Sequence, residues 1–249
     1  MRFLRLLAPV LISAVALTGC RTDVDVAVRV RPDGAGTVTV TVVLDAEAAR
    51  QVGDPSKLAL SDLTDAGWRV DGPSTSDGGL RIVAVRPFSS PEQLAAVLDE
   101  VGGAEGVFSG TSLEMTDGFA TSSTSFRTTL TLSGDPAQFS DAALSELLGG
   151  LPLARTPEEL AAEGATDRDS ATLTVRVSLP GGVDESNGEV AKGVATWSAS
   201  MAGGKATGET LTATASERRT TTWVLVGAGV LLIAVGLVVA VVGRVRRTD

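Results

Sequence analysis

The side chains that could carry out catalysis in this chain are almost all carboxylates. Its 249 residues include no histidine and no tyrosine, so most general-base schemes lose their usual member. Asp23 with Asp25 and Asp167 with Asp169 are acidic pairs separated by one residue, and such pairs can bind a divalent cation or serve a glycosidase-like reaction. The wet face of a strand and a solvated loop explain them better. We expect no enzyme activity, no metal and no cofactor.

The single cysteine, Cys20, has the surroundings of a lipid attachment site. Arg2 and Arg5 precede an apolar stretch, which ends in Leu17-Thr18-Gly19-Cys20 and is typical of an export signal with a lipobox. In that motif the thiol carries diacylglycerol, and palmitate-type chains anchor the mature protein. We expect residues 1–19 to be a lipoprotein signal peptide and Cys20 to be lipidated. The alternative is an ordinary buried cysteine behind a cleaved signal peptide.

A second anchor is predicted near the C-terminus. Residues 223–242 contain no charged or strongly polar side chain, and twenty helical residues at about 1.5 Å each cross a hydrocarbon core of ~30 Å. Residues 217–222 form a juxtamembrane segment, and the basic tail 243–249 stays in the cytoplasm under the positive-inside tendency. The predicted location is the cell membrane, lipid-anchored and single-pass, with the domain on the extracytoplasmic face.

Between the anchors, residues 20–216 are expected to form one extracytoplasmic domain. The segment 21–217 contains 14 basic residues against 29 acidic ones, a formal charge of −15. This charge argues against nucleic acid as a partner. It also repels the domain from an anionic bilayer, so a ligand is expected at a local patch or pocket.

Hydrophobic period and turn residues predict the elements of this domain. Valines at every second position predict strands over 24–30 and 38–44 in a hairpin, and Ser90 with Gln93 form a capping box for a helix over 91–101. Further strands are expected at 68–70, 80–86, 107–115, 119–132, 172–179, 190–199 and 207–215, and further short helices after Asp45, Asp54-Pro55, Asp135-Pro136 and Thr156-Pro157.

These elements predict the α+β class. The expected ectodomain is an antiparallel β-sheet with helices packed on one face, followed by the transmembrane helix. In this arrangement the last strand returns to the membrane beside the first.

Trp197 and Trp68 are the candidate ligand-binding residues. The predicted strand of Trp197 carries small residues on the same face, namely Ala191, Gly193, Ala195 and Ala199. A concavity there would let a lipid tail or sugar ring lie against the indole, with Trp68 as a second wall. The alternative is that Trp197 is a core anchor packed under a helix.

The last part of the domain resembles a known family. A strand ending at Pro180, the turn Ser186-Asn187-Gly188, the strand with Thr196-Trp197 and a final strand over 211–215 are similar to the LppM-like lipoproteins of actinobacteria. The lipobox and the closing helix match as well, whereas residues 135–169 are longer than the family's connection. The resemblance implies an envelope domain that handles phosphatidylinositol mannoside-type glycolipids and has no known catalytic residues.

Two functions follow as hypotheses. In the first, the chain is a membrane-tethered, non-catalytic module that binds or presents a membrane glycolipid. In the second, it is a scaffold that meets an envelope protein partner. An apolar cavity at Trp197 favours the first, and a solid core with an exposed apolar patch favours the second.

Overall fold

The computed structural model describes residues 21–52, 61–76, 78–102, 106–119, 121–132, 171–200 and 207–218. The predicted signal peptide, Cys20, the predicted span 223–242 and the region 135–169 lie outside the described residues. Within the described ranges, no helix is long and apolar enough to cross a membrane.

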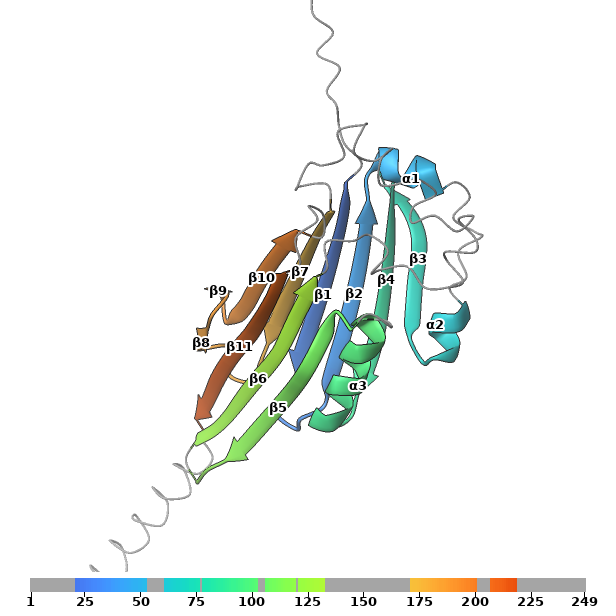
Figure 1. The fold of residues 1–249 in the computed structure, drawn as a ribbon. Coiled ribbons are helices and arrows are strands. Elements are labelled where there is room, and N and C mark those ends of the chain that lie inside the picture. Colours follow the sequence, from blue (N-terminus) through green and yellow to red (C-terminus); the bar gives the residue numbers. More distant parts are fainter. Residues whose placement is uncertain are drawn as a thin grey trace, which may run out of the picture.

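The described chain forms two β-sheets that face each other (Figure 1). The large sheet has seven strands in the order β3-β4-β2-β1-β7-β10-β9, and the small sheet has four in the order β5-β6-β11-β8. The large sheet comprises β1 (Thr22–Val30), β2 (Gly36–Leu44), β3 (Arg69–Ser76), β4 (Gly79–Phe88), β7 (Ala171–Ser178), β9 (Glu189–Ala191) and β10 (Val194–Ser200). The small sheet comprises β5 (Phe108–Asp117), β6 (Thr121–Leu132), β8 (Glu185–Ser186) and β11 (Thr207–Arg218).

Three short helices accompany the strands: α1 (Ala46–Val52), α2 (Ser61–Asp65) and α3 (Pro91–Gly102). α3 lies beside β5 and buries Leu94, Val97 and Leu98 in the core, so it extends the layer of the small sheet. The helix was predicted over nearly these residues. Its capping differs, because Gln93 accepts hydrogen bonds of 2.9 Å from the backbone N–H and the hydroxyl of Ser89, not of Ser90.

The predicted single antiparallel sheet with helices on one face is corrected to two sheets with few helices. β1 pairs antiparallel with β2 but parallel with β7. Alternating patterns identify strands, but they do not say which strands pair. After β4 the chain forms β5 and β6 of the small sheet. It then returns to the large sheet as β7, which pairs with the edge of β1 that β2 does not occupy.

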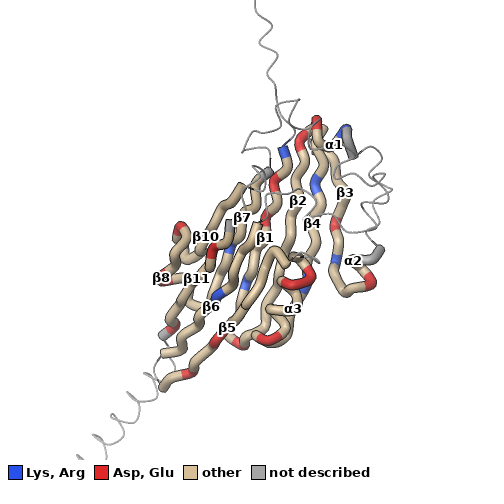
Figure 2. The backbone as a smooth tube through the Cα atoms, viewed as in Figure 1, with Lys and Arg blue, Asp and Glu red and all other residues tan. Residues whose placement is uncertain are grey.

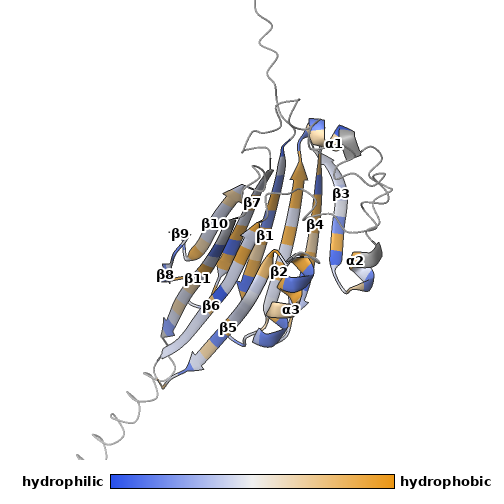
Figure 3. Ribbon diagram, viewed as in Figure 1, coloured by the Kyte–Doolittle hydropathy of each residue, from blue (hydrophilic) through white to orange (hydrophobic). Residues whose placement is uncertain are grey.

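The core fills the space between the two sheets. Val26 and Val28 of β1 are fully buried against residues such as Phe126 and Leu211 of the small sheet. Because side chains alternate along a strand, every second residue of β1 points inward and the others form the outer face of the large sheet. Figure 3 shows the resulting alternation of apolar and polar bands along β1 and β2.

The predicted strand 190–199 is interrupted by a turn. β9 and β10 form a hairpin around Lys192 and Gly193, both of which have positive φ values, 53° and 73°. Positive φ is accessible to glycine and turns the chain sharply. The expected surface of small residues around Trp197 is therefore reduced to Ala195 and Ala199 on β10.

The two ends of the described domain lie at opposite ends of its strands (Figure 1). β7 runs parallel to β1, so both strands end on the same side. Just past β7, Gly181 approaches the backbone of Ser216 near the end of β11, and Asp184 accepts hydrogen bonds from Ser216. Thr22 and Arg218 are thus far apart. The prediction that the last strand returns beside the first is wrong, because β11 belongs to the small sheet and runs in the direction of β1.

Candidate functional site

Trp197 is buried between the sheets, with 6% of its surface exposed. Its indole N–H donates a hydrogen bond of 3.0 Å to Oδ1 of Asn187. The same oxygen accepts the backbone N–H of Thr212 at 2.9 Å, and the Asn187 amide donates to the carbonyl of Thr210 at 2.7 Å. Asn187 therefore joins Trp197 of the large sheet to β11 of the small sheet.

Gly188 closes the space next to the indole. A Cβ built on Gly188 would lie 2.5 Å from Nε1 and 2.6 Å from Cε2 of Trp197. Only a residue without a side chain fits at this distance. The indole is thus covered by backbone, and its polar group is satisfied within the protein.

Trp68 is buried in a different part of the core, with 5% of its surface exposed. Its indole N–H donates to Oε2 of Glu100 on α3 at 3.0 Å, and Oε1 of Glu100 pairs with Nη2 of Arg86 at 3.3 Å. This contact joins the start of β3 to α3 and β4.

The structure does not bring the two tryptophans together. Trp68 directly precedes β3, and four strands separate β3 from β10 in the large sheet. At about 4.8 Å per strand, the two positions are roughly 24 Å apart. The two indoles cannot form walls of one small pocket, and a ligand role for Trp197 or Trp68 alone stays a prediction.

The acidic pair Asp23 and Asp25 lies on the outer face of β1, as the alternation predicted. Asp23 pairs with Arg21 at 3.0 Å, and Asp25 pairs with Arg176 of β7 at 2.6 Å. Among the described residues, no group of three or more acidic, histidine or cysteine side chains could hold a metal ion. Asp167 and Asp169 lie outside the described ranges.

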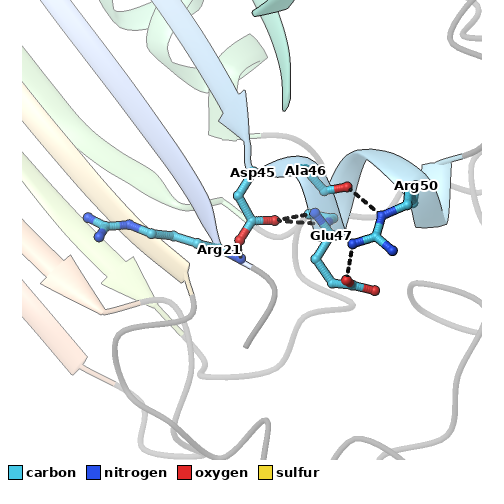
Figure 4. A network of polar contacts seen from close by, with 6 residues as sticks. Arg21, Asp45, Ala46, Glu47 and Arg50 are labelled. Atoms are coloured by element: carbon cyan, nitrogen blue, oxygen red, sulfur yellow. Dashed lines mark hydrogen bonds and ion pairs between the residues drawn. The ribbon is translucent and has the colours of Figure 1, made fainter. Parts of the chain in front are cut away.

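The start of β1, next to the predicted lipidation site, is fixed by Asp45 (Figure 4). Oδ2 of Asp45 accepts the backbone N–H of Arg21 at 2.9 Å, and the backbone N–H of Asp45 donates to the carbonyl of Arg21 at 3.0 Å. Oδ1 caps α1 by accepting the N–H groups of Glu47 and Ala48 at 3.0 and 2.8 Å. Asp45 therefore binds both the backbone N–H and the backbone carbonyl of Arg21.

A set of inward-facing apolar residues near the start of β1 is incompletely covered. Ile82, Val42, Val24 and Leu173 lie in register across β4, β2, β1 and β7, and we call them the apolar row. Leu173 is buried, whereas the other three are only half-buried although they face the inner side of the sheet. Exposed apolar surface is unfavourable in water by about 25 cal/mol per Å². The apolar row therefore leaves apolar surface on the inner side of the sheet in contact with water.

Sequence reasoning proposed Cys20, Trp197 and Trp68 as site residues, which stay predictions, and it missed two features of the structure. Asn187 was interpreted as a turn residue, and its contacts with Thr210 and Thr212 depend on a strand that follows about twenty residues later. The residues of the apolar row were predicted only as members of separate strands. Its half-burial depends on how far the second layer extends, for which the sequence has no signal.

Comparisons with known proteins give one structural likeness. No family model matches the chain, and no curated protein matches it. Among solved structures, the chain is similar to the folded domain of the LppM protein of Mycobacterium tuberculosis, determined by NMR. The two share 16% sequence identity with a TM-score of 0.41, over 82% of this chain and 94% of that domain. Membership of the LppM-like family stays a prediction.

Proposed function

We propose that this chain is a non-catalytic lipoprotein of the cell envelope that is attached to the cytoplasmic membrane at both ends. Cys20 carries the lipid, and residues 223–242 form the transmembrane helix. Diacyl lipid together with a spanning helix makes attachment effectively irreversible. The folded domain acts next to the membrane, and the apolar row binds the acyl part of a glycolipid of the phosphatidylinositol mannoside type.

The half-burial of the apolar row supports the lipid-binding part of this proposal. Val24, Val42 and Ile82 face the inner side of the large sheet, where neighbouring valines are fully buried. Val24 lies two residues from Thr22, and Val42 and Ile82 lie in register with Val24, so the row is close to the predicted lipidation site. An acyl chain laid across these three residues removes apolar surface from water, a favourable transfer.

A scaffold function is the second candidate, and the two tryptophans favour it. Both indoles are buried, and both N–H groups bind side chains of the protein itself. Both indoles therefore stabilise the folded domain itself. A stable domain of this kind is expected of a scaffold that binds a protein partner through its surface. In this case a lipid is not bound by the domain.

Photocrosslinking distinguishes the two functions. The full chain is purified in detergent and exposed to phosphatidylinositol mannoside, or to plain phosphatidylinositol, with a photoreactive acyl chain. We expect crosslinks to peptides of β2 and β4, and roughly tenfold weaker labelling when Val42 and Ile82 are both changed to Ser, because two apolar contacts are lost.

The matched control changes Val43 and Val83 to Ser. These residues follow Val42 and Ile82 on the same strands but point to the outer face, so labelling should stay unchanged. Stronger labelling by the mannoside than by plain phosphatidylinositol would show headgroup recognition. If the Val42/Ile82 variant and the Val43/Val83 variant were labelled equally, or if the folded chain were not labelled at all, lipid binding at the apolar row would be contradicted. The scaffold function would then remain.

A further inference from the structure

The separation of the chain ends restricts how the domain can stand at a membrane. β1 has nine residues, so its start and end are about 26 Å apart at ~3.3 Å per residue. The contact of Asp184 with Ser216 places the end of β11 beyond the end of β7, and therefore at the far end of β1. Thr22 and Arg218 are thus at least about 25 Å apart along the strands.

The lengths of chain beyond these ends are short. Asp45 binds both the backbone N–H and the backbone carbonyl of Arg21 (Figure 4), so only one residue step, about 4 Å, separates this fixed residue from Cys20. Five residue steps lead from Arg218 to Trp223, a maximum of about 18 Å. With both anchors in one bilayer, an upright domain would leave one anchor out of reach, so the strands must be inclined strongly toward the membrane plane.

The same chain lengths also determine which of the two sheets faces the bilayer. The two layers lie about 10 Å apart. If the small sheet faced the bilayer, Thr22 in the large sheet would be more than 10 Å from the headgroups, beyond the reach of Cys20. If the large sheet faces the bilayer, β11 is the distant layer, and the longer reach from Arg218 covers that distance.

The charges agree with this choice. Figure 2 shows both signs on the large sheet and acidic residues along α3. Among the described side chains of the second layer, exposed acids outnumber exposed bases: Glu92, Asp99, Glu114 and Asp117 are exposed, against Arg127. The outer face of the large sheet is balanced, with charged residues Arg29, Arg69, Arg81, Arg176, Asp23, Asp25, Asp71 and Glu189. The net charge of the domain predicts repulsion from an anionic bilayer, but of the two faces the balanced one is repelled least.

We propose that the domain lies along the membrane with the outer face of its large sheet, centred on β1 and β2, against the lipid headgroups. This proposal rests on the two-point attachment proposed above. In this orientation the small sheet and α3 point away from the bilayer, and the apolar row lies on the far side of the large sheet. A lipid bound there is presented away from the membrane.

Headgroup quenching of a fluorophore at two matched positions tests this orientation. The full chain, with Cys20 lipidated and hence unreactive, carries either Ser198→Cys on the outer face of β10 or Ser125→Cys on the outer face of β6. Both serines are exposed. After reconstitution into vesicles with spin-labelled phosphocholine headgroups, a fluorophore at position 198 should be quenched at least about twofold more than one at position 125.

Each other outcome overturns the proposal in its own way. Stronger quenching at position 125 would place the small sheet against the membrane. No quenching at either position, in a chain that stays with vesicles after a carbonate wash, would mean that the domain stands off the bilayer or joins two membranes. A chain that washes off would overturn the two-point attachment itself, and the orientation with it.

Discussion

The indole N–H of Trp197 on β10 donates a hydrogen bond of 3.0 Å to the side-chain oxygen of Asn187, which also accepts the backbone N–H of Thr212 on β11. One amide thus connects both sheets of the sandwich at the buried tryptophan. A buried donor that loses its partner keeps its desolvation penalty. This contact is therefore expected to contribute to stability out of proportion to its size.

Replacing Asn187 with Ala removes these contacts and leaves the Trp197 N–H without a partner. We expect the free energy of unfolding to fall by about 1–3 kcal/mol. Urea denaturation of residues 21–218, followed by tryptophan fluorescence, measures the change. Ser125→Ala, on the exposed face of β6, is the control and should stay within about 0.5 kcal/mol of the parent. Equal stability of the two variants would contradict a structural role for Asn187.

Gly188→Ala tests the close approach of backbone and indole. The new Cβ would lie 2.5 Å from Nε1 of Trp197, so the ring must move, at a cost of about 1–3 kcal/mol. A Cβ on Gly208 of β11 meets nothing within 4 Å, and Gly208→Ala should be neutral or slightly stabilising. Thermal unfolding of both variants gives the comparison. A tolerated alanine at position 188 would show that the space beside Trp197 is open.

Asp184 makes stability depend on pH. Hydrogen bonds from the hydroxyl and the backbone N–H of Ser216 hold the pKa of Asp184 below its ordinary value of 3.8. The ionised carboxylate is favoured in the folded state, so its contribution is fully present above the unfolded pKa. It is lost as the pH falls through the lower folded pKa.

Asp184→Asn should therefore flatten the acid side of the stability profile. Melting temperatures between about pH 2 and pH 6 should rise with pH less steeply in the variant than in the parent. Ser216→Ala removes the hydroxyl but keeps the backbone donor, so it should give an intermediate profile. Parallel profiles for all three proteins would contradict the assignment.

Glu100 joins α3 to Trp68 and Arg86. Glu100→Gln keeps a carbonyl oxygen for the Trp68 N–H, whereas Glu100→Ala leaves the buried donor without an acceptor. We expect the alanine variant to be less stable than the glutamine variant by about 1 kcal/mol. Denaturation monitored at Trp68, with Trp197 changed to Phe in both proteins, makes the measurement specific. Equal stability of the two variants would contradict this and show that the ion pair with Arg86, which both variants remove, dominates.

The local elements of this fold are predictable because their signals are local. The alternating valines of β1 and β2 and the apolar spacing of α3 each follow from residues a few positions apart, and the structure confirms all three elements. Partner choice was not predictable. The parallel pairing of β1 with β7 depends on a return of the chain more than 140 residues later, and no pattern within either strand contains that information.

The surroundings of Trp197 show the same division. The burial of Trp197 agrees with the alternative that it is a core anchor, but Asn187 joins it to β11 of the small sheet and not to a helix. The turn at Lys192 and Gly193 shortened the expected surface of small residues, and Asn187 found its partners on a strand distant in sequence. A sequence can indicate that an indole is inside, but what satisfies its N–H depends on three-dimensional neighbours.

The mass of the mature protein, purified from its own membrane, tests the two-point attachment most directly. The proposed function predicts a chain that begins at Cys20, carries diacylglycerol on that residue and retains the segment 223–242. Cys20→Ser should then keep the signal peptide, but the chain should remain in the membrane through its C-terminal helix. An unmodified N-terminus at another residue, or loss of the C-terminal segment, would contradict the attachment and the orientation derived from it.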